Sequence, residues 1–205
     1  MDEVIYMKRL RTAAALGMIL AILLGDFADF RERLETVHSS VLRLHILANS
    51  DSDEDQARKL LVRDALLRHS EELFAGCDTL EEMRDRALEE RETIRLIAQA
   101  ALEETGCDDP VTVQLAQMEF DTREYEELTM PGGEYEALRI LIGKGEGHNW
   151  WCVMYPPLCL PAVSPDAHFA PETAELLTEP EAYEVKFKCV ELWEQYFGEP
   201  AHAYS

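Results

Sequence analysis

The sequence has little positive charge for its length, and this shortage excludes several classes of partner. Its 205 residues contain 19 Lys and Arg against 41 Asp and Glu, a formal net charge of −22. Such a charge repels phosphate backbones and anionic lipid headgroups, so we do not expect nucleic-acid binding. The 47% apolar and 29% charged residues are close to ordinary globular usage, which disfavours collagen-like or disordered chains and predicts one folded domain.

Common catalytic and ligand-binding motifs are also missing. The sequence has no Gly-x-Ser-x-Gly elbow and no His-Glu-x-x-His pair. Asp51, Asp53 and Asp55 resemble the start of a calcium loop, but Gln56 and Val62 stand where that loop needs Gly and Glu. The Gly-Lys-Gly-Glu-Gly run lacks the Lys-Ser or Lys-Thr pair of a phosphate loop, so we interpret it as a turn. We expect no metal and no cofactor.

The first thirty residues have the layout of a signal sequence. Lys8, Arg9 and Arg11 precede the uncharged apolar run Ala13–Gly25, which ends at Asp26. As a helix this run spans roughly 20 Å, less than the roughly 30 Å hydrocarbon core of a bilayer, and so it matches a secretory signal better than a full transmembrane helix. Because basic residues tend to stay in the cytoplasm, the chain after Asp26 is predicted to be exported.

The sequence leaves open whether this leader is removed. A cut after Gly25 would place Leu23, and a cut after Ala28 would place Asp26, where the signal peptidase needs a small residue. The alternatives are a cleaved signal, an uncleaved anchor and a buried core helix of a cytosolic protein. A helical apolar stripe continues beyond the run, at Phe27, Phe30, Leu34 and Val37. We divide the chain into a leader with a helical extension (1–38), a single domain (39–198) and a tail (199–205).

Hydrophobic periodicity predicts an α+β domain with a small antiparallel or mixed sheet, two long helices and a C-terminal helix. The boundaries rest on two capping boxes, Ser52 with Asp55 and Thr79 with Glu82, and on a turn at 131–133 that favours an antiparallel strand pair. We interpret 161–180 as a surface loop. The expected strands are 41–48, 111–116, 134–142 and 150–155, and the expected helices are 52–70, 79–106 and 183–197.

Five cysteines leave at least one unpaired in an oxidising compartment. Cys152 and Cys159 flank two prolines that can turn the chain back, as a disulfide between them requires. The alternatives are two free thiols, or zinc ligands together with His148, although the Cys-x6-Cys spacing is not that of a zinc finger.

The most unusual string is His148-Asn149-Trp150-Trp151. In an extended strand the two adjacent indoles point to opposite faces of the sheet, so only one of them can reach a given core. An outward Trp beside His and Asn has the composition of a protein-binding hot spot, and the alternative is packing under the 161–180 loop. His45, opposite Leu44 on its strand, can equally be a structural histidine.

The chain resembles the stage II sporulation protein R family of endospore-forming Firmicutes over about residues 40–198. The resemblance rests on six motifs in the same order: Leu42-Arg-Leu-His-Ile-Leu-Ala-Asn-Ser-Asp-Ser-Asp-Glu-Asp-Gln56, Lys59-Leu-Leu-Val-Arg-Asp64, Tyr135-Glu-Ala-Leu-Arg139, Gly145-Glu-Gly-His-Asn-Trp-Trp-Cys-Val153, Pro156-Pro-Leu-Cys159 and Val185-Lys-Phe-Lys-Cys-Val-Glu-Leu-Trp193. The Gly-His-Asn-Trp-Trp-Cys string is the most specific of them.

The resemblance implies a signalling protein that is made in the forespore and exported into the space between the two sporulation membranes. There it would activate a membrane-embedded aspartic protease, the stage II sporulation protein GA, which cuts the precursor of sigma factor E. The family supplies no catalytic residues. By their position in its motifs, we expect these residues to bind the partner: His148, Asn149, Trp150 and Trp151 first, with His45, Asn49 and Asp51 second.

Two other functions remain as alternatives. One is an extracytoplasmic hydrolase of the cell envelope that uses His148, Cys152 and nearby acids. The other is a structural envelope anchor, which would depend on Ala13–Gly25 and not on the Trp pair.

Overall fold

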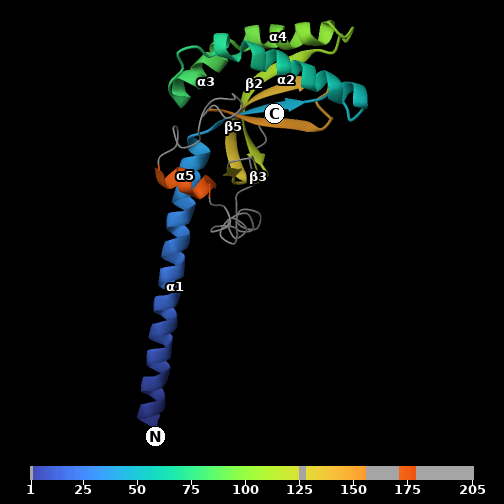
Figure 1. Ribbon diagram of the computed structural model, residues 1–205. Coiled ribbons are helices and arrows are strands. Elements are labelled where there is room, and N and C mark those ends of the chain that lie inside the picture. The colour runs from blue at the N-terminus through green and yellow to red at the C-terminus, as the bar shows by residue number, and fades with distance from the viewer. Residues whose placement is uncertain (1, 125–127, 156–170, 179–205) are drawn as a thin grey trace. The chain divides into compact units, whose positions relative to one another are not determined.

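The computed structural model describes residues 2–124, 128–155 and 171–178 (Figure 1). The chain divides into two units, one formed by residues 1–36 and 181–205 and the other by residues 37–180. Each unit is described by itself below.

Helix α1, Asp2–Ser39, contains the apolar run of the leader without a break. Within the described residues, Arg9–Ser39 is long and apolar enough to cross a membrane, a test that signal sequences also pass. Only 6% of its most apolar stretch is buried, which speaks against the core helix of a cytosolic protein. The predicted stripe continues as expected, because Phe30, Leu34 and Val37 are all buried. The structure therefore supports either a signal or an anchor.

The second unit is built on a four-stranded mixed sheet in the order β2-β5-β1-β6. Its strands are β1 (Leu42–Leu47), β2 (Val111–Phe120), β5 (Gly133–Ile142) and β6 (Asn149–Tyr155). β1 pairs parallel with β5 and antiparallel with β6, and the predicted antiparallel pairing of β2 with β5 is confirmed. All six residues of β1 are buried, as befits an inner strand.

Three helices cover one face of this sheet (Figure 1). They are α2 (Asp53–Leu73), α3 (Leu80–Glu89) and α4 (Arg91–Glu103). Thr79 and Glu82 form the complete predicted capping box of α3. At α2 the Ser52 hydroxyl accepts the Asp55 N–H as expected. The Asp55 carboxylate bonds to other residues and not to the Ser52 backbone, so this capping box is incomplete.

The prediction of one long helix after Thr79 was wrong, because the chain breaks at Glu90 into α3 and α4. Glu90 has φ −87° and ψ 8°, outside the helical region, although no Gly or Pro marks the position. Ala87 before the break and Ile94 after it are both buried in the same core. Tertiary packing therefore sets this break, and local sequence signals do not reveal it.

The hydrophobic core lies between the three helices and the sheet. Apolar side chains alternate along the strands and point to this face, as the period-two pattern requires. The main contributors from the sheet are Leu44, Ile46, Val111, Val113, Leu138, Ile140 and Ile142. Val62 and Leu66 of α2 and Ile94, Ala98 and Leu102 of α4 complete it.

A short hairpin separates β2 from β5, where the sequence had predicted only a turn. It consists of β3 (Arg123–Glu124) and β4 (Thr129–Met130). At the start of β5, Gly133 has φ +143°, and a Cβ there would lie 2.2 Å from the His38 ring. The His38 ring also contacts Tyr135 at 4.6 Å between centroids. Only glycine fits this position, because both the backbone conformation and the close ring exclude a side chain.

The surface loop expected at 161–180 contains a helix, α5 (Pro171–Thr178), so that part of the prediction was wrong. Proline at the first helical position followed by Glu, Ala and Leu is a recognisable helix start. The rest of the predicted loop and the predicted C-terminal helix at 183–197 lie outside the described residues.

Candidate partner-binding site

The predicted site residues meet at the end of the sheet where β1 stops and β6 begins. Asn49, just after β1, holds the connection from β5 to β6. Its Oδ1 accepts the Lys144 N–H at 3.0 Å, and its Nδ2 donates to Asp55 Oδ2 at 3.1 Å. Gly143, at φ +57°, passes so close that a Cβ would lie 2.3 Å from Asn49 Oδ1. Asn49 therefore shapes the site instead of presenting a free amide.

Asp51 fixes the start of the unusual string. Its Oδ1 accepts the His148 N–H at 2.6 Å and lies 2.5 Å from His148 Nδ1. The side chains remain 58% and 76% exposed respectively, so this pair can be reached from solvent.

Lys59 is a buried member of the site whose role sequence reasoning missed. From α2 its Nζ donates to the carbonyl oxygens of His148 at 2.9 Å and Asn149 at 3.4 Å, and to Gln56 Oε1 at 2.6 Å. Burial lowers the pKa of the ammonium, an effect opposed by the nearby Asp51 carboxylate. Lys59 thus ties α2 to the first residues of β6. The sequence did offer a signal of this role, because Lys59 stands directly beside leucines of α2.

Asp55 is the second buried charge that supports the site. Its carboxylate accepts hydrogen bonds from Ser50 Oγ at 2.6 Å and Asn49 Nδ2, and it pairs with Arg58 at 3.3 Å. The Ser50 hydrogen bond is the main cause of its lowered pKa, and burial opposes it. The carboxylate therefore stays ionised and holds the loop after β1 in place.

The two tryptophans point to opposite faces of the sheet, because consecutive strand residues alternate. Trp150 pairs with Ile46 and packs against the core under α2, where the Arg63 guanidinium lies 5.5 Å from its ring centroid. Trp151 pairs with His45 on the other face. Both indoles are half-buried, so Trp151 is the one that can contact a partner away from the helices.

His45 supports Trp151 from beneath. The two rings stack at 3.9 Å between centroids with 14° between their planes, and Phe120 meets the Trp151 ring edge-on at 4.6 Å. His45 Nε2–H donates to Asn149 Oδ1 at 2.9 Å, while its buried Nδ1 has no hydrogen-bond partner among the described residues. Burial lowers the pKa of His45 to about 4, helped by the Arg139 and Arg43 charges. The ring is neutral at pH 7.

Cys152 is disulfide-bonded, whereas Cys77 and Cys107 are free. Cys159, its expected partner, lies outside the described residues, so the pairing stays a prediction. A bonded sulfur is neither a nucleophile nor a metal ligand, which removes Cys152 from both the hydrolase and the zinc alternatives. Over the described parts of the chain, no group of three His, Cys, Asp or Glu residues is arranged to hold a metal ion.

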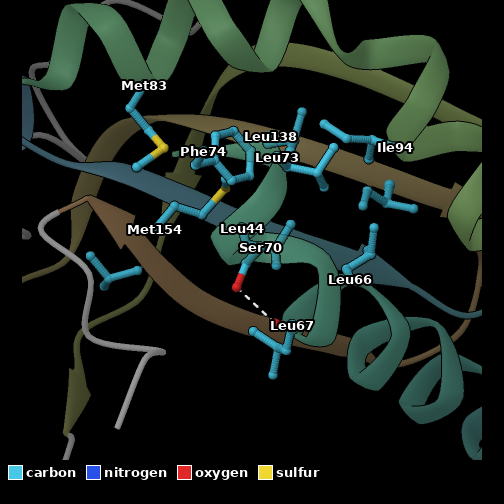
Figure 2. Close-up of a pocket in the computed structure, with 12 residues that line it drawn as sticks. Leu44, Leu66, Leu67, Ser70, Leu73, Phe74, Met83, Ile94, Leu138 and Met154 are labelled. Atoms are coloured by element: carbon cyan, nitrogen blue, oxygen red, sulfur yellow. Dashed lines mark hydrogen bonds between the residues drawn. The ribbon is translucent and has the colours of Figure 1, made fainter. Parts of the chain in front are cut away.

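A separate pocket opens on the helix-covered face (Figure 2). It encloses about 590 Å³ of space, part of it open to solvent. Its single hydroxyl, Ser70 Oγ, donates to the Leu67 carbonyl at 2.7 Å, so no polar group in the lining awaits a ligand. The lining consists of Leu44, Leu66, Leu67, Ser70, Leu73, Phe74, Met83, Ile94, Leu138, Ile140, Val153 and Met154. The predicted site residues do not contribute to it.

Comparison with known proteins identifies the family. The family model of stage II sporulation protein R matches residues 38–164, more than half of the chain. Stage II sporulation protein R of Bacillus subtilis (strain 168) is 38% identical over 123 residues, which cover 60% of this chain and 55% of that protein. The chain thus spans about half the length of this curated relative. No solved structure matches. The matched region contains all seven predicted contact residues, and the chain belongs to the stage II sporulation protein R family.

Proposed function

We propose that this protein is an exported sporulation signal that activates a membrane-embedded aspartic protease, the stage II sporulation protein GA, in the mother cell. That protease would then cut the precursor of sigma factor E. The observation that carries the proposal is the family match over residues 38–164, which includes the site. Helix α1 supports export, because it is apolar, largely uncovered by protein and long enough to engage a membrane.

The geometry of the site supports action by binding. His45 is buried and bonded to Asn149, and Cys152 is held in a disulfide, so neither offers a free base or nucleophile. What remains accessible is a surface made of Trp151, Asn149, His148 and Asp51. An aromatic side chain on a supported surface is a common anchor of protein interfaces.

The mechanism that fits such a surface is a population shift. The domain would bind the outer face of the protease and favour its active arrangement. A ligand shifts an equilibrium only by its difference in affinity for the two states, and moving it from 1:99 to 99:1 requires about 5.5 kcal/mol. A single aromatic anchor supplies part of this, so we expect a contact area larger than the Trp151 ring.

Co-expression tests the proposal. The full chain, the protease and the sigma factor E precursor are produced together in a host that does not form spores, and precursor cleavage is followed by immunoblot. We expect cleavage with the chain and none without it. Trp151→Ala should fold, be exported and trigger much less cleavage. Replacing Leu16, Leu20 and Leu24 with Asp should keep the domain folded but prevent its delivery.

The outcomes separate the proposal from its alternatives. No cleavage with the wild-type chain would refute it. Normal cleavage by Trp151→Ala would place the contact surface elsewhere on the domain. An envelope anchor would tolerate loss of the indole but not of the apolar run. Trp150→Ala is a control with a different expected defect, because Trp150 packs against the core and its loss should lower stability first.

A further inference from the structure

The face of the sheet opposite the helices carries a continuous row of side chains across all four strands. Gln114 of β2 pairs with Arg139 of β5, Arg139 pairs with His45 of β1, and His45 pairs with Trp151 of β6. Paired strand residues point to the same face, so these four side chains lie side by side. Thr112 and Asn149 lie on the same face in the next row towards the loops, and both are exposed.

Arg139 is the only residue of this row that is charged at neutral pH. Among the described residues its buried Nε has no hydrogen-bond partner, and none of the ion pairs there includes it. Although Arg68 of α2 does not, several other arginines of this acidic chain pair with carboxylates. Those that do so in the described part are Arg31, Arg58, Arg63, Arg84, Arg86 and Arg95.

The surroundings of Arg139 explain why it stays unpaired. Its cross-strand neighbours are Gln114 and His45, and its neighbours on the same face of β5 are Ala137 and Leu141. None of the four carries a carboxylate, and the nearby Arg43 adds a second positive charge that, like Arg139, disfavours protonation of His45. The paired and same-face neighbours of Arg139 thus bring no negative charge to it, on a chain of net charge −22. A buried donor without a partner is costly unless something binds there.

We propose that the row Gln114–Arg139–His45–Trp151 is the surface that contacts the protease, and that Arg139 pairs with a carboxylate side chain in an extracytoplasmic segment of it. The inference rests on the proposed function and adds to it the face of the sheet and the chemistry of the partner. Guanidinium binds carboxylate through two parallel hydrogen bonds, and Arg and Trp are the side chains most enriched at interface hot spots. The half-exposed Trp151 ring would pack against an apolar side chain beside that carboxylate.

The helix-covered face offers a matched comparison. Arg68 of α2 is exposed and belongs to none of the ion pairs among the described residues. It therefore carries the same charge as Arg139 but lies away from the row. If the charge of the domain as a whole drives recognition, Arg68 and Arg139 should matter equally. If the row is the contact surface, only Arg139 should matter.

The experiment is the co-expression assay with full-length variants, with protein level and thermal unfolding of each variant measured in parallel. Arg139→Glu should lower the rate of precursor cleavage by about tenfold or more, the loss typical of a hot-spot residue. Arg68→Glu should stay within about twofold of the wild-type rate. Thr112→Trp, a large side chain at an exposed position of the same face, should also lower cleavage, because it keeps the partner off the row. Arg139→Gln decides the matter should Arg139→Glu fail to accumulate.

A reciprocal change tests the carboxylate. Each Asp and Glu in the extracytoplasmic segments of the protease is replaced with Arg in turn, and one such variant should restore cleavage to Arg139→Glu. Wild-type cleavage together with undiminished cleavage by a folded Arg139→Glu would overturn the inference and leave the proposed function standing. An equal loss in Arg68→Glu would overturn it as well. A wild-type chain that triggers no cleavage would refute the proposed function, and the inference with it.

Discussion

The two faces of the four-stranded sheet are built from alternate residues of the same strands, yet they differ in chemistry. On one side of β1, Leu44 and Ile46 enter the apolar core under the helices. On the other side, Arg43 and His45 are just as buried, at 0% and 2% exposure, but among aromatic rings. Burial alone therefore does not distinguish the faces. The difference teaches that one face stabilises the fold by excluding water, whereas the other buries polar groups, whose desolvation costs free energy that their contacts must offset.

Adjacent residues of β5 give the sharpest test of this comparison and the largest expected effect. Ile140→Ala removes a fully buried side chain from the helix-covered face and should lower the free energy of unfolding by about 2–5 kcal/mol. Arg139→Ala, one residue away, should cost under about 1 kcal/mol, because it removes an unpaired cation. Thermal and urea unfolding of both full-length variants in mild detergent measures the difference. Equal losses would mean that both faces serve stability alone.

The buried His45, on the face opposite the helices, predicts that the stability of the fold depends on pH. His45 has a pKa of about 4 when folded against 6.5 as its ordinary value. Between these values the unfolded chain binds more protons, so stability present above pH 6.5 should be lost as the pH falls towards 4. With allowance for solvent screening, the loss is about 2–3 kcal/mol. His45→Gln should flatten the stability profile between pH 6.5 and 5, as followed by urea unfolding.

Measurements below pH 5 do not give the same information, because carboxyl groups also titrate there. The pKa values of Asp55 and Glu82 are lowered by hydrogen bonds to their ionised forms, so their contributions are lost only below their ordinary values of 3.8 and 4.5. The window above pH 5 isolates His45 from them. A wild-type profile that is flat in this window would show that the ring is not held neutral by its burial.

Much of the helix-covered face could be predicted from the sequence, because it follows from periodicity. The alternation of Leu42, Leu44 and Ile46 and the Thr79–Glu82 box led to the correct strand and the correct helix start. The break at Glu90 could not be predicted, since it depends on packing between elements distant from it. Helix α5 could have been found from Pro171 and the helix formers that follow.

The site was predicted as a set of residues but not as an arrangement. The unusual composition of His148–Trp151 drew attention to the start of β6, and alternation correctly separated the two indoles. The sequence could not reveal the hydrogen bonds that hold the connection from β5 to β6. Asn49 accepts the Lys144 N–H and Asp51 accepts the His148 N–H, each across more than ninety residues of sequence. The proposed role of Arg139 could not be predicted, because it depends on register: the pairing of β5 with β1 places Arg139 beside His45.

Lys59 ties helix α2 to the start of β6, and its replacement gives the smallest of the three effects. Lys59→Met keeps the length of the side chain but removes the donor to the carbonyl oxygens of His148 and Asn149, which should cost about 1–2 kcal/mol. Lys144→Met, at an exposed position in the adjacent turn, should change stability by under about 0.5 kcal/mol. Because the Lys59 bonds hold the start of β6, the His148 amide should exchange its hydrogen faster in Lys59→Met and at the wild-type rate in Lys144→Met. Unchanged exchange despite lower stability would mean that Lys59 supports α2 alone, and that the start of β6 keeps its geometry without a tie to the helices.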